Sequence, residues 1–410
     1  MKASSWMTGI ECRRHRALRE ARLVGAYGVL ALLLTLLPMV SHAGAREQAA
    51  RMHARLAGVP PTEAVLTSMA TDIGNGQAVN AAMTAMQNDN FYTVVLKNFA
   101  MPWTNRAQTQ YAPLNDYVAT VIGMVRDDVP FNTLLSADLL YVGASGQGLP
   151  AYSNSNNDHY AQLESSGAHL GDKSVLVPAT QSSVTGIPAA ATAGIMTTRA
   201  AAQAFFALGT NRAMFRFTLI NHLCKDVTDV MDTSRPPDRI RQDVSRSPGG
   251  DSRVFMNNCI GCHSGMDPMA QAFAYYDFVF ATDPSTGSIQ YTPGKVVGKY
   301  FHNNTTFPTG FVTPDDSWTN RWRAGPNSLL GWSAALPGSG AGAKSLGAEL
   351  GNSDQFAQCQ VQKVFTAMCL RPPSNDADRS QVKTMVGTFK SQGYKLKRVF
   401  ADAAAYCSGT

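Results

Sequence analysis

The chain has 410 residues, a length typical of two or three packed units rather than one small module. Hydrophobic residues make up 44% of it and charged residues only 16%, which excludes a disordered polyelectrolyte, and a mean hydropathy of -0.13 excludes a polytopic membrane protein. The formal net charge is +6, but most of it lies in residues 1–43, where six basic side chains accompany two acidic ones. The bulk charge therefore gives no argument for nucleic acid as a partner.

Residues 1–43 have the order of a secretory signal peptide. Basic residues continue to Arg22, residues 23–40 are apolar, and Ser41-His42-Ala43 places small residues just before a cleavage site. We therefore expect cleavage after Ala43 and a periplasmic or otherwise exported bacterial protein. The alternative is an uncleaved anchor helix, because the apolar stretch approaches the roughly 20 residues that span a bilayer. Only then would the chain contact a membrane.

Helical patterns dominate residues 44–142, which we interpret as an N-terminal helical module. Gly58 ends a helix over 46–57, and Pro60-Pro61-Thr62-Glu63 begins another that runs to about Ile73. Further helices are predicted over 77–100 and 114–127. Residues 143–250 form a second part, in which 143–195 are rich in Gly, Ser, Asn and Ala and predict a long irregular segment. A helix over 199–226 then leads to the next part.

Residues 259–263 read Cys-Ile-Gly-Cys-His, the pattern at which haem c is attached. Cys259 and Cys262 are spaced to form one thioether each with the two haem vinyl groups, and His263 then becomes the proximal ligand of the iron. Gly261 gives this short segment room. Export agrees with the assignment, because covalent haem attachment in bacteria takes place outside the cytoplasm. We therefore predict one covalent haem c as the cofactor.

The cysteine pair has two other interpretations. A zinc site would need a second Cys or His pair at short spacing, and Cys359 and Cys369 are too far apart. A thioredoxin-like dithiol would need a preceding strand, whereas residues 251–256 resemble a capped helical turn. Asp267-Pro268 resembles the start of a second helix over 268–277. The sequence thus predicts a helix, a haem loop and a helix, within a cytochrome c-like segment over 251–345 that includes a long irregular loop at 282–345.

The sixth ligand of the iron stays open. No methionine occurs between Met269 and Met368, so His302 is one candidate distal ligand and Met368, or Met385, is another. Met266 is too close to the motif to reach the opposite face of the ring. Water or an open position is the third alternative. The ligand matters because a methionine raises the reduction potential.

Residues 346–410 are predicted to form a C-terminal helical module that packs on the haem region, with helices over 354–370, 376–392 and 395–406 and Gly393 as a helix end. Six basic residues without an acidic one among them form a candidate face for an acidic redox partner protein: Arg379, Lys383, Lys390, Lys395, Lys397 and Arg398. The alternative is that these basic side chains simply face solvent on a pair of helices and bind no partner. Four cysteines outside the motif allow three disulfide pairings, and we expect at least one bridge to tie the 199–226 helix or the C-terminus to the haem region: Cys224, Cys359, Cys369 and Cys407.

Together these features predict a mainly α, multi-helix protein with a cytochrome c-like haem module and long irregular loops. The predicted function is that of an exported monohaem c-type cytochrome that transfers one electron to a partner protein. The alternatives are a haem-dependent oxidoreductase, with peroxide, oxygen or an organic substrate at an open distal position, and a surface or assembly protein with a structural haem.

Three stretches resemble the haem c-bearing families of unknown function that are abundant in planctomycetes and also found in proteobacteria. They are residues 55–61 with 125–138, the haem segment 259–273 with 276–278 after it, and the tail from Phe356 to Phe400. The chain departs from these families in the loop 282–345 and at Leu370-Arg371-Pro372, where they often have Gly-Arg. The resemblance implies haem binding and electron transfer, and it implies no substrate.

Overall fold

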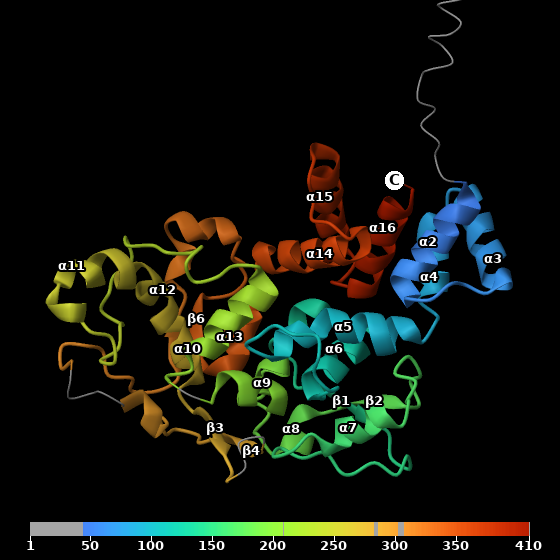
Figure 1. The fold of residues 1–410 in the computed structure, drawn as a ribbon. Coiled ribbons are helices and arrows are strands. Elements are labelled where there is room, and N and C mark those ends of the chain that lie inside the picture. Colours follow the sequence, from blue (N-terminus) through green and yellow to red (C-terminus); the bar gives the residue numbers. More distant parts are fainter. Residues whose placement is uncertain (1–43, 208, 283–285, 302–306, 410) are drawn as a thin grey trace, which may run out of the picture. The chain divides into compact units, whose positions relative to one another are not determined.

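The computed structural model describes residues 44–207, 209–282, 286–301 and 307–409 (Figure 1). The predicted signal peptide and the candidate ligand His302 lie outside the described residues. Helix accounts for 53% and strand for 7% of the structure, so the predicted mainly α class is confirmed. No described helix has the length and apolar composition needed to cross a bilayer.

The first helices follow their sequence signals closely. They are α2 (Ala45–Ala57), α3 (Glu63–Gly74), α4 (Ala78–Ala85) and α6 (Asp116–Arg126). Gly58 ends α2 with φ 71, and Thr62 and Asn115 accept hydrogen bonds from the first-turn amides of α3 and α6. The single helix predicted over 77–100 is wrong: it divides into α4, a π-helix (Phe91–Leu96), α5 (Lys97–Ala100) and a 3-10 turn (Met101–Thr104).

The middle of the chain contains short elements. The predicted irregular segment 143–195 holds α7 (Asp158–Ser165), α8 (Gln181–Thr185) and β2 (Leu176–Ala179), which pairs antiparallel with β1 (Leu140–Gly143). The helix predicted over 199–226 is also wrong, because residues with positive φ interrupt it: Gly209 at 67, Asn211 at 57 and Cys224 at 52. The pieces are α9 (Arg199–Phe205), α10 (Arg212–Thr218) and a π-helix (Leu219–Leu223).

The Cys-Ile-Gly-Cys-His motif lies in a helical run, not in a loop between two helices. Asp251 caps the start of α11 (Ser252–Val254), as predicted, and a π-helix (Phe255–Cys259) then leads directly into α12 (Ile260–Ala270). The predicted helix over 268–277 is therefore wrong. Pro268 lies inside α12, Asp267 is buried within it rather than capping a new helix, and β3 (Tyr276–Phe280) follows.

Three antiparallel two-stranded ribbons complete the described strands. After β1 and β2, β3 pairs with β4 (Gly287–Tyr291), and β5 (Ser317–Thr319) pairs with β6 (Ser339–Ala341). The predicted irregular segment 282–345 contains β4 to β6 and several short 3-10 turns, which are Gly298–Phe301, Arg321–Arg323 and Pro326–Leu330. It brings Trp322 fully into the core.

The C-terminal helices match the prediction. They are α14 (Asp354–Cys369), α15 (Asp376–Ser391) and α16 (Leu396–Ser408), and Gly393 has the expected positive φ of 74. The helix before them, α13 (Gly342–Gly351), was not predicted and begins within the expected irregular segment. Two disulfides form, Cys224–Cys359 and Cys369–Cys407. The first ties the end of the 199–226 region to α14 and the second joins α14 to α16. The expectation that a bridge would reach the haem segment is therefore wrong.

One hydrophobic core contains residues from most parts of the described chain, from Ala49 to Cys407. A smaller cluster of Ile240, Val244, Phe255 and Ile260 has Cys259 packed against it. The motif thus begins on a local apolar support that is separate from the main core, and this support fixes the N-terminal end of α12.

Candidate functional site

The motif places three potential donors within one turn at the start of α12. Cys259 is the N-cap residue, and Cys262 and His263 follow three and four residues later, so the three side chains project to the same side of the helix. All three side chains are partly exposed. The two cysteines are free, whereas Cys224, Cys359, Cys369 and Cys407 are paired. The fold therefore leaves unpaired the two thiols that the motif requires.

His263 is oriented by a carboxylate on its own helix. Its Nδ1 lies 3.2 Å from Oδ1 of Asp267, four residues later, and its side chain is 20% exposed while that of Asp267 is fully buried. A carboxylate only accepts hydrogen bonds, so this contact places the imidazole proton on Nδ1 and leaves the lone pair on Nε2. In many metal sites a carboxylate accepts a hydrogen bond from one nitrogen of a histidine and so fixes the orientation of the imidazole whose other nitrogen binds the metal.

Asp267 stays ionised because two arginines surround it. Arg212 Nε and Nη2 donate to its two oxygens at 2.7 and 2.8 Å, and the backbone N–H of Arg241 lies 3.3 Å from Oδ2. Burial alone would raise the pKa of the Asp267 carboxyl, but the charge and hydrogen bonds of Arg212, with the charge of Arg241, hold this pKa well below its usual range. His263 therefore faces a carboxylate anion at neutral pH.

The arginines have further partners that bind three segments together. Arg212 Nη2 also donates to Asp243 at 2.8 Å. Burial alone would lower the pKa of Arg212, but Asp267 and Asp243 raise it above its usual value. Arg241 is 2% exposed, donates to the carbonyl of Thr210 at 3.0 Å and stacks over the ring of Tyr300 at 4.7 Å. We call Asp267, Arg212, Asp243 and Arg241 the charge cluster.

Sequence reasoning does not find the charge cluster. Considered alone, the segment 225–253 has equal numbers of acidic and basic side chains and gives no sign of a site. Its Arg241 and Asp243 contact residues that lie outside the segment. The spacing of His263 and Asp267 is the available signal, because residues four apart on one helix are neighbours. The expected helix start at Asp267-Pro268 conceals this signal, because it separates the two residues into different elements.

The thiol of Cys262 is not activated. Its Sγ lies 3.5 Å from the carbonyl oxygen of Val227. Burial, with smaller effects of Asp226 and Cys259, raises the pKa of this thiol above its ordinary value. A protonated thiol is a poor nucleophile, so Cys262 differs from the activated thiol of a redox dithiol, whose pKa is lowered. In the described part of the chain, no group of three or more His, Cys, Asp or Glu side chains is arranged to hold a metal ion.

A neighbouring segment crosses closely over the motif at Gly261. The amide of Asp232 donates to the Gly261 carbonyl at 2.9 Å, and a Cβ at position 261 would lie 3.3 Å from Cβ of Met231. Because Gly261 has no side chain, residues 231–233 can pack directly against the motif at this position. Met231 and Met256 are 51% and 54% exposed, so apolar surface flanks the cysteines on the solvent side.

Gly265 allows α12 to lie directly against Trp322. A Cβ at this position would overlap the fully buried indole ring. We expect Gly265→Ala to lower the free energy of unfolding by about 1–3 kcal/mol, because the indole has no space to move in a packed core. Urea unfolding of the purified protein measures this.

Gly387→Ala is the matched control, since Gly387 is also helical but an alanine Cβ at this position would meet no neighbouring segment within 4 Å. It should raise the free energy of unfolding by about 0.5–1 kcal/mol. Equal effects of the two substitutions would contradict the close packing of α12 on Trp322.

The three methionines considered as distal ligands, or set aside as such, are all buried. Met368 is 2% exposed on α14 and lines a cavity of about 870 Å³ with Phe99 and Lys363, to which no motif residue contributes. Met385 is buried on α15, and Met266 is buried within α12. The structure therefore brings Cys259, Cys262 and His263 together and keeps Met368 at a separate cavity.

The predicted basic face is largely neutralised. Four of its six cations form ion pairs, which are Arg379–Asp376, Lys390–Asp354, Lys397–Asp128 and Arg398–Asp402. Two of the acidic partners, Asp128 and Asp354, come from distant parts of the sequence, which is why the run of residues 379–398 looks purely basic when considered alone.

Comparison of the chain with protein-family models, with curated proteins and with solved structures finds no match.

Proposed function

We propose that this chain is an exported monohaem c-type cytochrome that transfers one electron to a partner protein. The observation that carries the proposal is the combination of two unpaired thiols and an oriented imidazole on one turn of α12, in a chain whose other described cysteines form disulfides. Cys259 and Cys262 would hold the two vinyl groups, and His263 Nε2 would hold the iron. The resemblance to planctomycete haem c families points the same way.

The donor set fits this group for three reasons. Burial raises the pKa of the Cys262 thiol, which suits a permanent link better than exchange chemistry. The Nδ1 of His263 is held by Asp267, so Nε2 is the free donor atom. The exposed side chains of Met231 and Met256 offer apolar surface beside the cysteines, of the kind that a porphyrin covers.

Haem c, when bound, supplies a one-electron couple of iron. The chain sets the conditions for that couple. Asp267 keeps the proton on His263 Nδ1 and leaves Nε2 as the donor atom, while Arg212 and Arg241 share the negative charge of Asp267. The charge cluster also holds Asp267, and through it the imidazole of His263, in one orientation, which would limit reorganisation of the chain around a bound haem.

The test is to express the full chain with the cytochrome c maturation machinery and to analyse the secreted protein. A band that keeps haem-dependent peroxidase staining after boiling in detergent supports attachment, and an N-terminus at Gly44 supports cleavage of the signal peptide. A low-spin ferric spectrum supports electron transfer, and a high-spin form that rapidly binds cyanide or peroxide supports the oxidoreductase alternative. A low-spin haem that no partner reduces or oxidises would support the structural role. An unstained band overturns the proposal.

Replacement of His302 and Met368 distinguishes the distal ligands. Tyr300, two residues before His302, donates to the carbonyl of Ala270 at the end of α12, whereas Met368 lines the separate cavity. We expect His302→Ala to convert the ferric spectrum towards high spin and Met368→Leu to leave it unchanged. An unchanged spectrum in His302→Ala would remove His302 as a ligand.

A further inference from the structure

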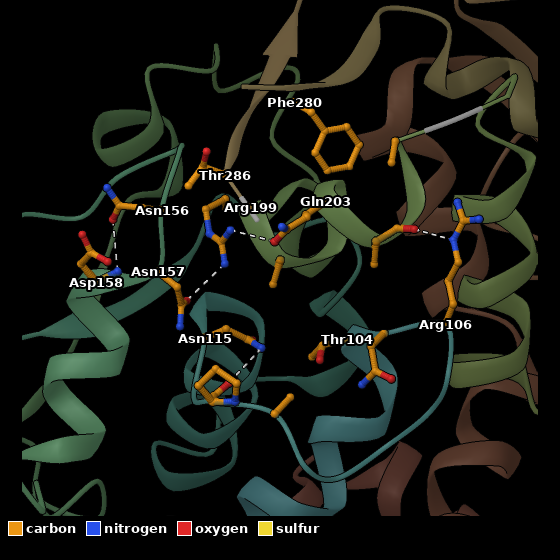
Figure 2. Close-up of a pocket in the computed structure, with 16 residues that line it drawn as sticks. Thr104, Arg106, Asn115, Asn156, Asn157, Asp158, Arg199, Gln203, Phe280 and Thr286 are labelled. Carbon is orange, nitrogen blue, oxygen red and sulfur yellow. Dashed lines mark hydrogen bonds between the residues drawn. The ribbon is translucent and has the colours of Figure 1, made fainter. Parts of the chain in front are cut away.

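A cavity of about 680 Å³ lies outside the motif, and no residue of the motif or of the charge cluster lines it. Its size is within the range of small-molecule sites. Asn115 lies at the start of α6, Asn157 at the start of α7, and Arg199 and Gln203 on α9, while Phe280 comes from the end of β3. Figure 2 shows Arg199 between Asn157 and Gln203, with Phe280 on the other side of the cavity from Asn115.

Arg199 is the notable cation of this cavity because it is buried without a counter-ion. It is 6% exposed. Its Nη1 donates to Gln203 Oε1 at 2.9 Å and its Nη2 to Asn157 Oδ1 at 3.3 Å. Both partners are neutral amides, and no ion pair of Arg199 occurs among the described residues, although a buried charge normally requires one.

The two nearby carboxylates serve other groups. Asp116 accepts hydrogen bonds from the backbone amides of Arg199 and Ala200 and from the hydroxyl of Tyr152, so its charge stabilises the start of α9 rather than the guanidinium. Asp158 is exposed at the rim, next to Asn156 in Figure 2. The guanidinium of Arg199 therefore lines the cavity with a positive charge that no ion pair within the described ranges compensates, and it has N–H groups left to donate to a ligand.

The lining determines which anion fits. One planar guanidinium matches one planar, singly charged carboxylate. A doubly charged phosphate would call for a second buried cation, and Arg106 is exposed, with its Nε donating to the carbonyl of Ala204 at 2.7 Å. The side-chain oxygens of Asn115, Asn156 and Asn157 each accept one hydrogen bond within the chain, from the amides of Val118 and Asp158 and from Arg199 Nη2 respectively. Each oxygen keeps a second lone pair, which can accept from a hydroxyl group. Phe280, 40% exposed, adds an apolar face.

We propose that this cavity binds a small polyhydroxylated carboxylate, of the class of sugar acids, with the carboxylate on Arg199 and the hydroxyl groups on the surrounding amides. This site is independent of haem attachment.

Isothermal titration calorimetry of the mature protein with D-glucuronate tests the proposal. We expect saturable binding of glucuronate, at least tenfold weaker binding of neutral D-glucose, and at least tenfold weaker binding of inorganic sulfate. Glucose binding as tightly as glucuronate would overturn the role of Arg199, and sulfate binding as tightly would overturn the choice of a carboxylate. No saturable binding of glucuronate would overturn the site.

Variants assign the binding to the cavity. Arg199→Gln should weaken glucuronate binding at least tenfold, and Gln203→Ala should weaken it several-fold, which keeps the test available if Arg199→Gln does not fold. Arg46→Gln is the control, because Arg46 is exposed and ion-paired with Glu63 away from the cavity. Equal affinity in Arg199→Gln and the control would contradict the proposal. Haem staining should be the same in all three variants, so a failure here is distinct from a failure of the proposed function.

Discussion

Replacement of both Cys259 and Cys262 with serine is expected to abolish covalent haem attachment while leaving the fold intact. Neither thiol belongs to a disulfide, both side chains are partly exposed, and the hydroxyl is smaller than the thiol it replaces. The substitution should therefore change the free energy of unfolding little, apart from the contribution of the lost haem itself. The measurement is peroxidase staining of the secreted protein after boiling in detergent, together with its circular dichroism spectrum.

The control is the double substitution Cys224→Ser with Cys359→Ser. It removes a disulfide between residues 135 apart in sequence, which should lower the free energy of unfolding by about 2–5 kcal/mol. Haem staining should persist in the molecules that are secreted. If the Cys259 and Cys262 variant kept its stained band, or if both double variants lost it equally, attachment at the motif would be contradicted.

The elements that could be predicted are those with local signals. Gly58, Thr62 and Asn115 end or cap their helices through their own backbone conformation or side chain, so the bounds of α2, α3 and α6 follow from a few neighbouring residues. The C-terminal helices are similar. The errors fall where positive φ at non-glycine residues such as Asn211 and Cys224 breaks a helix that the apolar pattern alone would continue.

The site is predictable in its donors and not in its support. Cys259, Cys262 and His263 are adjacent in sequence, so the spacing alone identifies them. Arg212 and Asp267 are 55 residues apart and meet only because α10 packs on α12. Pro268 predicts a helix start because proline favours the first turn, yet α12 runs through it. Ion pairing of a buried carboxylate thus prevails over its local capping preference.

Asp267→Asn is expected to be the most damaging single substitution at the site. It leaves Arg212 with one carboxylate instead of two and deprives buried Arg241 of its closest anion. Removal of one partner from a buried ion pair costs about 3–5 kcal/mol. Asp243→Asn is the matched control, because it removes the other carboxylate of Arg212 and does not touch His263.

The pH dependence of this effect has a definite sign. The pKa of Asp267 is lowered in the folded chain, so its contribution to stability is complete above its ordinary unfolded pKa of about 3.9 and is lost as the pH falls through the lower folded value. The difference in unfolding free energy between the wild type and Asp267→Asn should therefore be constant from pH 7 to 5 and should decrease below about pH 4. Urea unfolding at pH 7, 5, 4 and 3 measures it.

The two variants should differ at His263 even where they agree in stability. Asp267→Asn replaces the anion at Nδ1 with a neutral amide, which lowers the basicity of Nε2 and should raise the reduction potential of the attached haem. Asp243→Asn leaves the hydrogen bond to Nδ1 in place and should shift the potential less. Redox titration of the two purified variants checks this, and equal potentials would show that Asp267 supports the fold without acting on the histidine.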